Sequence, residues 1–306
     1  MARRLFYCDH HLFPLPAGHK FPLAKYRILR GLLAADGFFQ LEPAPLASEN
    51  VISLAHDPAY VHRFVTGALE ASAMRRIGFP WSEALVRRTR AAAGGTLAAA
   101  EEAIATGLGG NLAGGTHHAF RGEGAGFCVF NDIAIAIFFL RTRGLVRRAA
   151  VVDLDVHQGD GTAAIFAEDA DLFTFSMHGR NNFPFRKQHS TLDVELEDGT
   201  GDGSYLDALA GALPRVFDFR PEVVFYQSGV DALAGDRLGR LALTHEGLKQ
   251  RDRMVMQRCR DSQVPLVITL GGGYAQPISR TAEAHANTFR TAVEVLVEMP
   301  KQVVSI

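Results

Sequence analysis

Short apolar runs alternate with longer amphipathic segments along most of the chain. The runs are bounded by glycine or charged residues, and they predict β-strands at Gly110–Ala113, Ala149–Leu154, Leu172–Ser176, Val223–Gln227 and Leu266–Leu270. Between and around them, apolar residues at helical spacing predict helices at roughly Leu23–Ala35, Ala91–Ala105, Asn131–Arg141, Tyr205–Val216, Thr244–Arg260 and Thr281–Val297. Strands that alternate with helices favour an α/β fold with a central parallel sheet and helices on both faces.

We predict that residues 1–306 form a single domain, because no internal repeat or low-complexity linker divides the chain. The proline-rich stretch from Pro43 to Pro58 leaves one alternative open, a separate N-terminal lobe that ends before about residue 90.

Polar and glycine-rich segments follow each predicted strand at its carboxyl end. They are Gly114–His118, Asp153–Gly161, Ser176–His178, Ser228–Asp231 and Gly271–Tyr274. Open parallel sheets bind ligands along the edge formed by the carboxyl ends of their strands. The agreement of these separate segments therefore predicts one functional site at that edge.

The segment after the second of these strands predicts a metal site. Asp153, Asp155 and His157 alternate with apolar residues, so they would share one face as the strand ends. Buried carboxylates need a partner. We predict Asp155, His157 and Asp231 as ligands, because catalytic zinc takes three protein ligands and keeps a position for water. Iron(II) or manganese would also suit this oxygen-rich set. The alternative is an Asp155–His157 ion pair at a helix end, with Asp231 in a turn.

A tandem histidine pair and a tyrosine are the candidate catalytic groups. A catalytic imidazole is usually oriented by a carboxylate on its other nitrogen, so we pair one of His117 and His118 with Asp153 and the other with Asp160. Tyr274 follows three glycines and could donate a hydrogen bond to an oxyanion that forms on a carbonyl. The alternatives are that one histidine only packs beneath the other, and that Tyr274 lies on the surface of a turn.

Composition narrows the class of partner. The formal net charge is −1, which argues against binding to nucleic acid or to an anionic membrane surface. Three cysteines lie far apart without a CxxC pair, so we expect no disulfide framework and a cytoplasmic location. The first residues do not read as a signal peptide, and the apolar run Ile133–Leu140 is too short for a membrane span of about 20 residues.

Taken together, these segments resemble the histone deacetylase family, which has the arginase–deacetylase fold. The matching motifs span roughly residues 110–280 and are Gly114–His118, Gly126–Asp132, Asp153–Gly161, Ser228–Asp231 with Gly235–Asp236, and Gly271–Tyr274. Gln158, the segment Asp236–Gly239 and the N-terminal segment Leu15–Pro22 are similar to the class IV branch (histone deacetylase 11-like) and its bacterial members.

The resemblance implies a metal-dependent amidohydrolase that removes an acetyl or longer fatty acyl group from the ε-amine of lysine. Asp155, His157 and Asp231 would bind zinc. His118, partnered by Asp160, would act as general base and then acid, and His117, partnered by Asp153, would be its electrostatic neighbour. Tyr274 would polarise the carbonyl.

The resemblance also implies a substrate slot and a second ion. Phe127 and Phe183 would form the walls of a narrow slot for the acylated lysine chain, and the other expected substrate-binding residues are Gly126, Leu238 and Gly272. A structural potassium ion would be bound by Asp153, Ser176 and the backbone of Asp155, His157 and Met177.

Other functions remain open at this point. The same chemistry could act on a small acylated amine such as an acetylpolyamine, or the chain could bind acyl-lysine without cleaving it. Guanidine hydrolysis of the arginase type would need more carboxylates for a two-metal centre than the sequence clearly supplies.

Overall fold

The computed structural model describes residues 3–297 and contains one eight-stranded sheet; residues 1–2 and 298–306 of the expected domain lie outside the described residues. Every strand pair in the sheet is parallel, in the order β2-β1-β3-β8-β7-β4-β5-β6. The strands are β1 Arg4–Tyr7, β2 Gln40–Pro43, β3 Leu108–Asn111, β4 Ala149–Asp153, β5 Leu172–Gly179, β6 Leu192–Leu196, β7 Val223–Gln227 and β8 Leu266–Thr269. The predicted α/β fold with a parallel sheet is confirmed.

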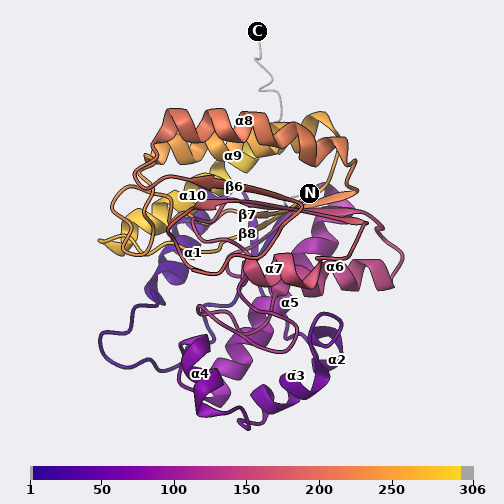
Figure 1. Ribbon diagram of the computed structural model, residues 1–306, viewed down its shortest axis with the longest axis vertical. Coiled ribbons are helices and arrows are strands. Elements are labelled where there is room, and N and C mark those ends of the chain that lie inside the picture. The colour runs from indigo at the N-terminus through magenta and orange to yellow at the C-terminus, as the bar shows by residue number, and fades with distance from the viewer. Residues whose placement is uncertain (1–2, 298–306) are drawn as a thin grey trace.

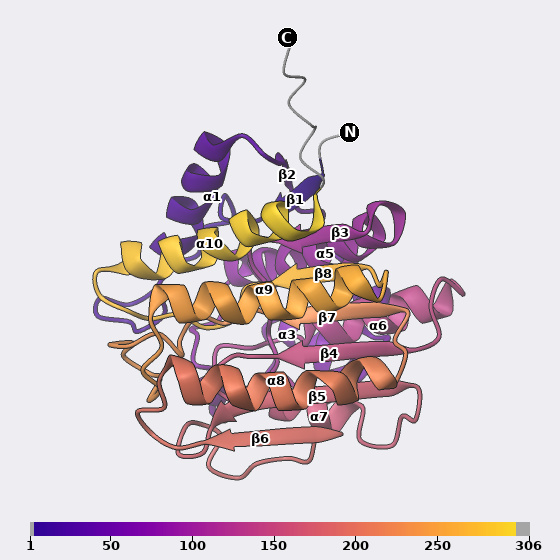
Figure 2. The same cartoon turned by 90° about the horizontal axis from the view of Figure 1, so that it is seen from above.

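Helices cover both faces of the sheet (Figures 1 and 2). One face carries α1 Ala24–Asp36, α8 Asp202–Asp218, α9 His245–Asp261 and α10 Ile278–Leu296. The other carries α5 Glu83–Thr106, α6 Asp132–Thr142 and α7 Asp160–Ile165. Three short helices lie beyond α5 on that side, α2 Glu49–Ile52, α3 Pro58–Val65 and α4 Ala71–Ile77 (Figure 1).

Burial on both faces explains why the central strands were predictable from the sequence. All residues of β4 and β7 are buried, so these strands are continuous apolar runs. The sequence did not predict β1, β2 and β6 or the helices α2, α3, α4 and α7. The edge strands β2 and β6 are only half-buried and carry charged residues, which leaves a weak apolar pattern.

The N-terminal segment is part of the same sheet. β1 pairs with β3, and β2 pairs with β1, so residues before 90 supply one edge of the sheet as well as the short helices. This arrangement does not agree with the alternative of an independent N-terminal lobe.

Strand register brings the predicted site segments to one edge. Asp153, the last residue of β4, is paired with Ser176 of β5 and with Gln227 of β7, and Gln227 is paired with Thr269 of β8. Because the strands are parallel and end at the same level, the loops that follow them meet above their carboxyl ends.

Candidate metal centre and catalytic cavity

Three buried ligand atoms converge after β4 and β7. One ligand atom from each of Asp155, His157 and Asp231 lies within 4.8 Å of the other two. His157 Nδ1 is 3.0 Å from Asp155 Oδ1 and 3.1 Å from Asp231 Oδ2. No described residue donates a hydrogen bond to Asp231 Oδ2, although this oxygen is fully buried. Two carboxylates and an imidazole around one point fit the donor set of a divalent cation such as zinc.

Backbone N–H groups hold both carboxylates in this orientation. Gly272 N donates to Asp155 Oδ2 (2.6 Å), and Val156 N donates to Asp231 Oδ1 (2.9 Å). A Cβ at position 272 would lie 1.8 Å from Asp231 Oδ2. Residue 272 must therefore be glycine for the backbone to approach the metal ligands so closely.

Each of the tandem histidines has a carboxylate partner. His117 Nδ1 lies 2.7 Å from Asp153 Oδ2, and His118 Nδ1 lies 2.6 Å from Asp160 Oδ1. These hydrogen bonds fix the rings and leave the Nε2 atoms for other partners. The structure thus brings together the pairs that the family resemblance implied.

The two histidines differ in their protonation. Burial, together with the neighbouring His117, lowers the pKa of His118 to about 4, so this imidazole is neutral near neutral pH. Burial also acts on His117, but Asp153 and the other nearby carboxylates outweigh it and raise the pKa of His117 to about 9. Near neutral pH the His118 ring is therefore free to accept a proton, whereas the His117 ring already carries a positive charge.

Tyr274 lines the cavity, and the carboxylate of Asp236 orients its backbone. The sequence did not identify Asp236 as a functional residue. The Tyr274 N–H donates to Asp236 Oδ2 (2.6 Å), while Asp236 Oδ1 accepts from Leu238 N (2.8 Å) and Gly239 N (3.0 Å). Burial, reinforced by Asp231 and Asp155, raises the pKa of the Tyr274 phenol well above its usual value. The phenol therefore keeps its proton and can donate it in a hydrogen bond.

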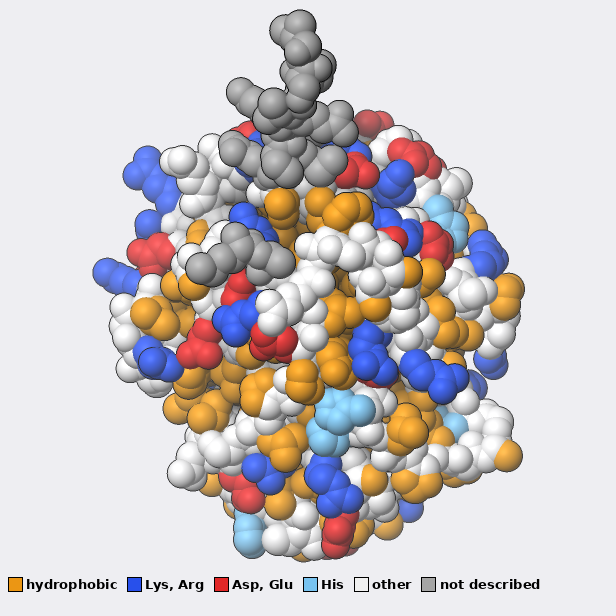
Figure 3. Space-filling model, turned by 180° about the vertical axis from the view of Figure 1, so that it is seen from behind, with side chains coloured by type: hydrophobic (Ala, Val, Ile, Leu, Met, Phe, Trp, Pro, Cys, Tyr) orange, Lys and Arg blue, Asp and Glu red, His pale blue; other side chains and the backbone are white. Residues whose placement is uncertain are grey.

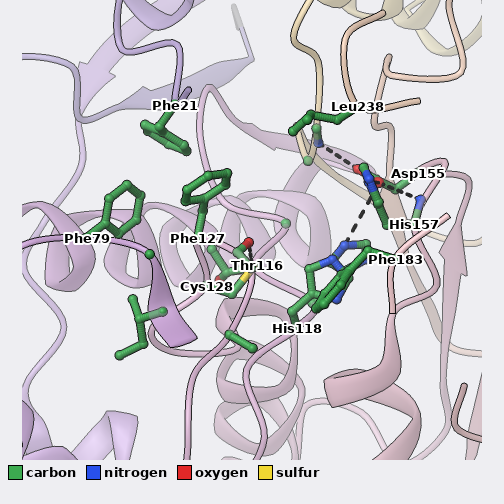
Figure 4. A pocket seen from close by; sticks show the side chains of 18 of the residues that line it. Phe21, Phe79, Thr116, His118, Phe127, Cys128, Asp155, His157, Phe183 and Leu238 are labelled. Atoms are coloured by element: carbon green, nitrogen blue, oxygen red, sulfur yellow. Dashed lines mark hydrogen bonds and ion pairs between the residues drawn. The ribbon is translucent and has the colours of Figure 1, made fainter. Parts of the chain in front are cut away.

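A cavity of about 510 Å³ connects these groups. The expected substrate-binding residues all line it, namely Gly126, Phe127, Phe183, Leu238 and Gly272. Figure 4 shows Phe127, Phe183 and Leu238 around the pocket. The Phe183 ring lies 4.9 Å from the His118 ring, measured between centroids. A Cβ on Gly126 would lie 2.8 Å from His118 Cδ2, so glycine is needed to seat Phe183 and His118 side by side.

The cavity continues behind Phe127 into a space that we call the aromatic chamber, lined by Phe13, Phe21, Phe79 and Phe127. Ring centroids of Phe21 and Phe79 lie 5.4 Å and 5.3 Å from that of Phe127. Figure 4 shows Phe21, Phe79 and Phe127 on the opposite side of the pocket from Asp155 and His157. The sequence did not predict the chamber, because its rings other than Phe127 come from the N-terminal segment and from the loop before α5.

The residues expected at the potassium site lie together at the ends of β4 and β5. Asp153 and Ser176 are paired across the two strands, and Met177 follows Ser176. No hydrogen bond from a described residue reaches the backbone oxygens of Asp155 or His157. These carbonyls are therefore free to bind a cation, as the expected ligand set requires.

Two further polar residues support the site and were missed as functional residues. Lys25 in α1 is buried and donates from Nζ to the Gly271 backbone oxygen (3.0 Å). Asp132 accepts from Gly115 N (3.1 Å) and Thr116 N (2.7 Å), which fixes the loop before the tandem histidines. Asp132 lies in a motif that carried the resemblance, whereas a lysine in an amphipathic helix usually indicates an exposed face.

The surface shows no dominant charge on the side seen in Figure 3, where basic and acidic side chains are interspersed over the described residues. Within residues 3–297, no helix combines the length and apolar character that crossing a bilayer requires.

Comparison with known proteins agrees with this geometry. The family described as "Histone deacetylase domain" matches residues 19–290. The chain is 46% identical over 299 residues to an uncharacterized protein of Picosynechococcus sp., covering 96% of this chain and 100% of that protein. It is 32% identical to "Histone deacetylase-like amidohydrolase" of Pseudomonas aeruginosa, covering 86% of this chain and 74% of the relative. It is 31% identical to "Histone deacetylase 2" of Arabidopsis thaliana, covering 86% and 71%.

Among solved structures, the HDA15 HD domain superimposes with a TM-score of 0.80 at 21% identity, over 98% of this chain and 90% of that one. This likeness supports the fold. Together with the match over residues 19–290, the relatives show that the chain belongs to the histone deacetylase family.

Proposed function

We propose that this protein is a metal-dependent lysine deacylase that hydrolyses the amide bond of an ε-acylated lysine. Family membership supports hydrolysis of an amide. The observation that carries the proposal is the convergence, in one cavity, of the Asp155–His157–Asp231 cluster, the His118–Asp160 pair and Tyr274. Two carboxylate-oriented histidines beside such a cluster suit hydrolysis better than binding alone.

Zinc is the metal we propose for Asp155, His157 and Asp231, with iron(II) as the second candidate because two of the ligands are carboxylates. When bound, the ion would supply Lewis acidity to the carbonyl oxygen and lower the pKa of a water molecule. We also propose potassium at the site of Asp153, Ser176 and the backbone of Asp155, His157 and Met177.

The chain's own residues would perform the proton transfers. His118 Nε2 accepts the proton of the attacking water, because the lowered pKa of His118 keeps the ring neutral and Asp160 holds its Nδ1. The protonated His118 then donates to the leaving lysine amine. Tyr274 donates a hydrogen bond to the carbonyl oxygen as negative charge develops there. His117, charged near neutral pH, adds positive potential beside His118.

Phe127 and Phe183 would flank the lysine side chain. Both rings line the cavity, and burial of the methylene chain between them would contribute about 0.8 kcal/mol per CH₂. Gly126, Leu238 and Gly272 complete the lining that we assign to substrate. The aromatic chamber behind Phe127 supports acyl groups longer than acetyl, which is consistent with the resemblance to class IV.

The charge of the lining favours acyl-lysine in a protein over a small polyamine. Among the described residues that line the cavity, Asp155 is the one carboxylate, whereas Arg76, Arg88 and Arg240 are cationic. Arg76 and Arg240 are paired with Glu123 and Asp198, so Arg88 is the cation that would repel a polycationic amine. We place the enzyme in the cytoplasm, since its three cysteines are buried and free.

One substrate panel tests this proposal. Peptides with acetyl-, octanoyl- and myristoyl-lysine and a set of acetylpolyamines are incubated with the zinc-loaded enzyme, with and without chelator, and the released amine is measured. We expect release from acyl-lysine peptides, loss with chelator and recovery when zinc or iron(II) is returned. Peptide binding without release from any substrate after metal reconstitution would instead establish a binding module.

A further inference from the structure

Helix α5 places Arg88 in the wall of the cavity, and the proposed mechanism does not use this cation. Arg88 lines the cavity and is 6% exposed. Its guanidinium carbon lies 4.5 Å from the centroid of the Tyr26 ring, and its Nη1 contacts Cys8 Sγ. No described residue accepts a hydrogen bond from its Nε or Nη2.

This arginine has no carboxylate partner in the part of the chain that the structure describes. Buried arginines are normally paired, because an isolated charge loses its hydration without compensation. Arg251, which is fully buried, has Asp252 at 2.8 Å. For Arg88, burial alone lowers the pKa, to about 10, and no acid opposes it.

Lys25 provides a contrast beside the same tyrosine ring. Its Nζ lies 5.3 Å from the centroid of the Tyr26 ring and donates to the Gly271 oxygen. Burial lowers the pKa of Lys25, but Asp231, Asp155 and Asp236 act against it. Arg88 contacts the same Tyr26 ring and Cys8, and no described carboxylate lies within ion-pair distance of its guanidinium. The cavity is therefore lined by the acidic metal cluster and, beside Tyr26, by a cation without a counter-ion.

We propose that Arg88 binds a carboxylate at the far end of the acyl group, so that the enzyme hydrolyses lysine amides of dicarboxylic acids. This proposal rests on the proposed function. A guanidinium presents parallel N–H donors that match a carboxylate, and a low-dielectric wall strengthens that interaction. The rings of the aromatic chamber would enclose the methylene groups between the two ends.

The reaction balances without a co-reactant. Water adds across the scissile amide, the C–N bond breaks and a C–O bond forms. Both protons of the water end on the lysine nitrogen, which leaves as an ammonium group, and the other product is a free dicarboxylate.

Matched acyl pairs of equal chain length test the proposal. Lysine peptides carry butyryl or succinyl, pentanoyl or glutaryl, hexanoyl or adipoyl, and octanoyl or suberoyl groups, and kcat/KM is measured for each. For at least one length we expect the carboxylate-ended acyl group to be preferred by about tenfold or more. A preference for the methyl-ended partner at every length would overturn the proposal.

Variants assign any preference to Arg88. Arg88→Met should reverse the preference, and Arg88→Lys should retain part of it. Arg76→Met is the matched control, because Arg76 also lines the cavity but is paired with Glu123 (2.9 Å). A preference that survives Arg88→Met in folded protein would contradict the assignment.

A binding measurement separates this inference from the proposed function. Calorimetric titration of the zinc-loaded wild type and Arg88→Met compares glutarate with pentanoate and adipate with hexanoate. We expect tighter binding of the dicarboxylates that is lost in the variant. Equal binding of both classes, weakened equally by the variant, would mean that Arg88 holds the carboxylate of an ordinary product. If no acyl-lysine is hydrolysed, the proposed function fails, and this titration alone decides on Arg88.

Discussion

The two ends of the cavity are built from different parts of the chain and follow different rules. At the metal end, loops after β3, β4, β7 and β8 supply the polar groups, and backbone N–H groups or carboxylates partner most of them. At the chamber end, the chain before α5 supplies most of the aromatic rings, and α5 supplies the unpaired Arg88. In the function that we propose, the sheet edge would supply the reacting groups, whereas the N-terminal third would determine which acyl group is accepted.

The largest expected effect is at the metal end. Asp231→Ala should lose the metal and reduce hydrolysis by about a thousandfold or more, because the ion is worth several kcal/mol in the transition state. Elemental analysis of purified protein, compared with an Asp198→Ala control at an exposed ion pair, measures occupancy. Full metal occupancy in Asp231→Ala would remove this residue from the ligand set.

Tyr274→Phe should retain the metal and lower kcat by about 10²–10³-fold, the usual cost of one oxyanion hydrogen-bond donor. The ring and its packing near Phe127 are kept, so the effect isolates the phenol. Stopped assays at saturating substrate give kcat, and elemental analysis gives the metal content. Turnover equal to that of the wild type would exclude the phenol from the reaction.

Asp160→Asn should reduce kcat by about 10–100-fold, since the carboxylate that orients His118 and stabilises its charged form is lost. The expected change includes the pH profile, because His118 would be harder to protonate. A variant with lower kcat and an unaltered pH profile would point to general structural damage instead of a role in positioning.

The smallest effect is expected at the chamber end, where Phe79→Leu should lower the ratio of kcat/KM for octanoyl-lysine to that for acetyl-lysine by about tenfold or less. Phe79 touches the acyl chain in this proposal but not the reacting atoms. Paired kcat/KM measurements on the two peptides give the ratio. An unchanged ratio would place longer acyl chains outside the aromatic chamber.

The central part of the sheet could be predicted from the sequence, whereas the edge strands and the short helices could not. Central strands β4 and β7 were predictable because burial on both faces requires continuous apolar residues. The alternation of Asp153, Asp155 and His157 was visible because a strand end places alternate side chains on one face. The edge strands and the short helices α2–α4 carry weaker patterns and were missed.

The sequence by itself determined the α/β class, the sheet edge that carries the polar residues, and a candidate set of acids, histidines and tyrosine, because strand periodicity and motif order are local properties. The tertiary structure alone decided which polar groups support the site: Asp236 accepts a hydrogen bond from the backbone of Tyr274, and Lys25 donates one to Gly271. It also decided that Arg88 lies buried beside Tyr26. Burial and pairing of a charge depend on residues far away along the chain, so no local pattern around Arg88 could have shown that it faces a cavity.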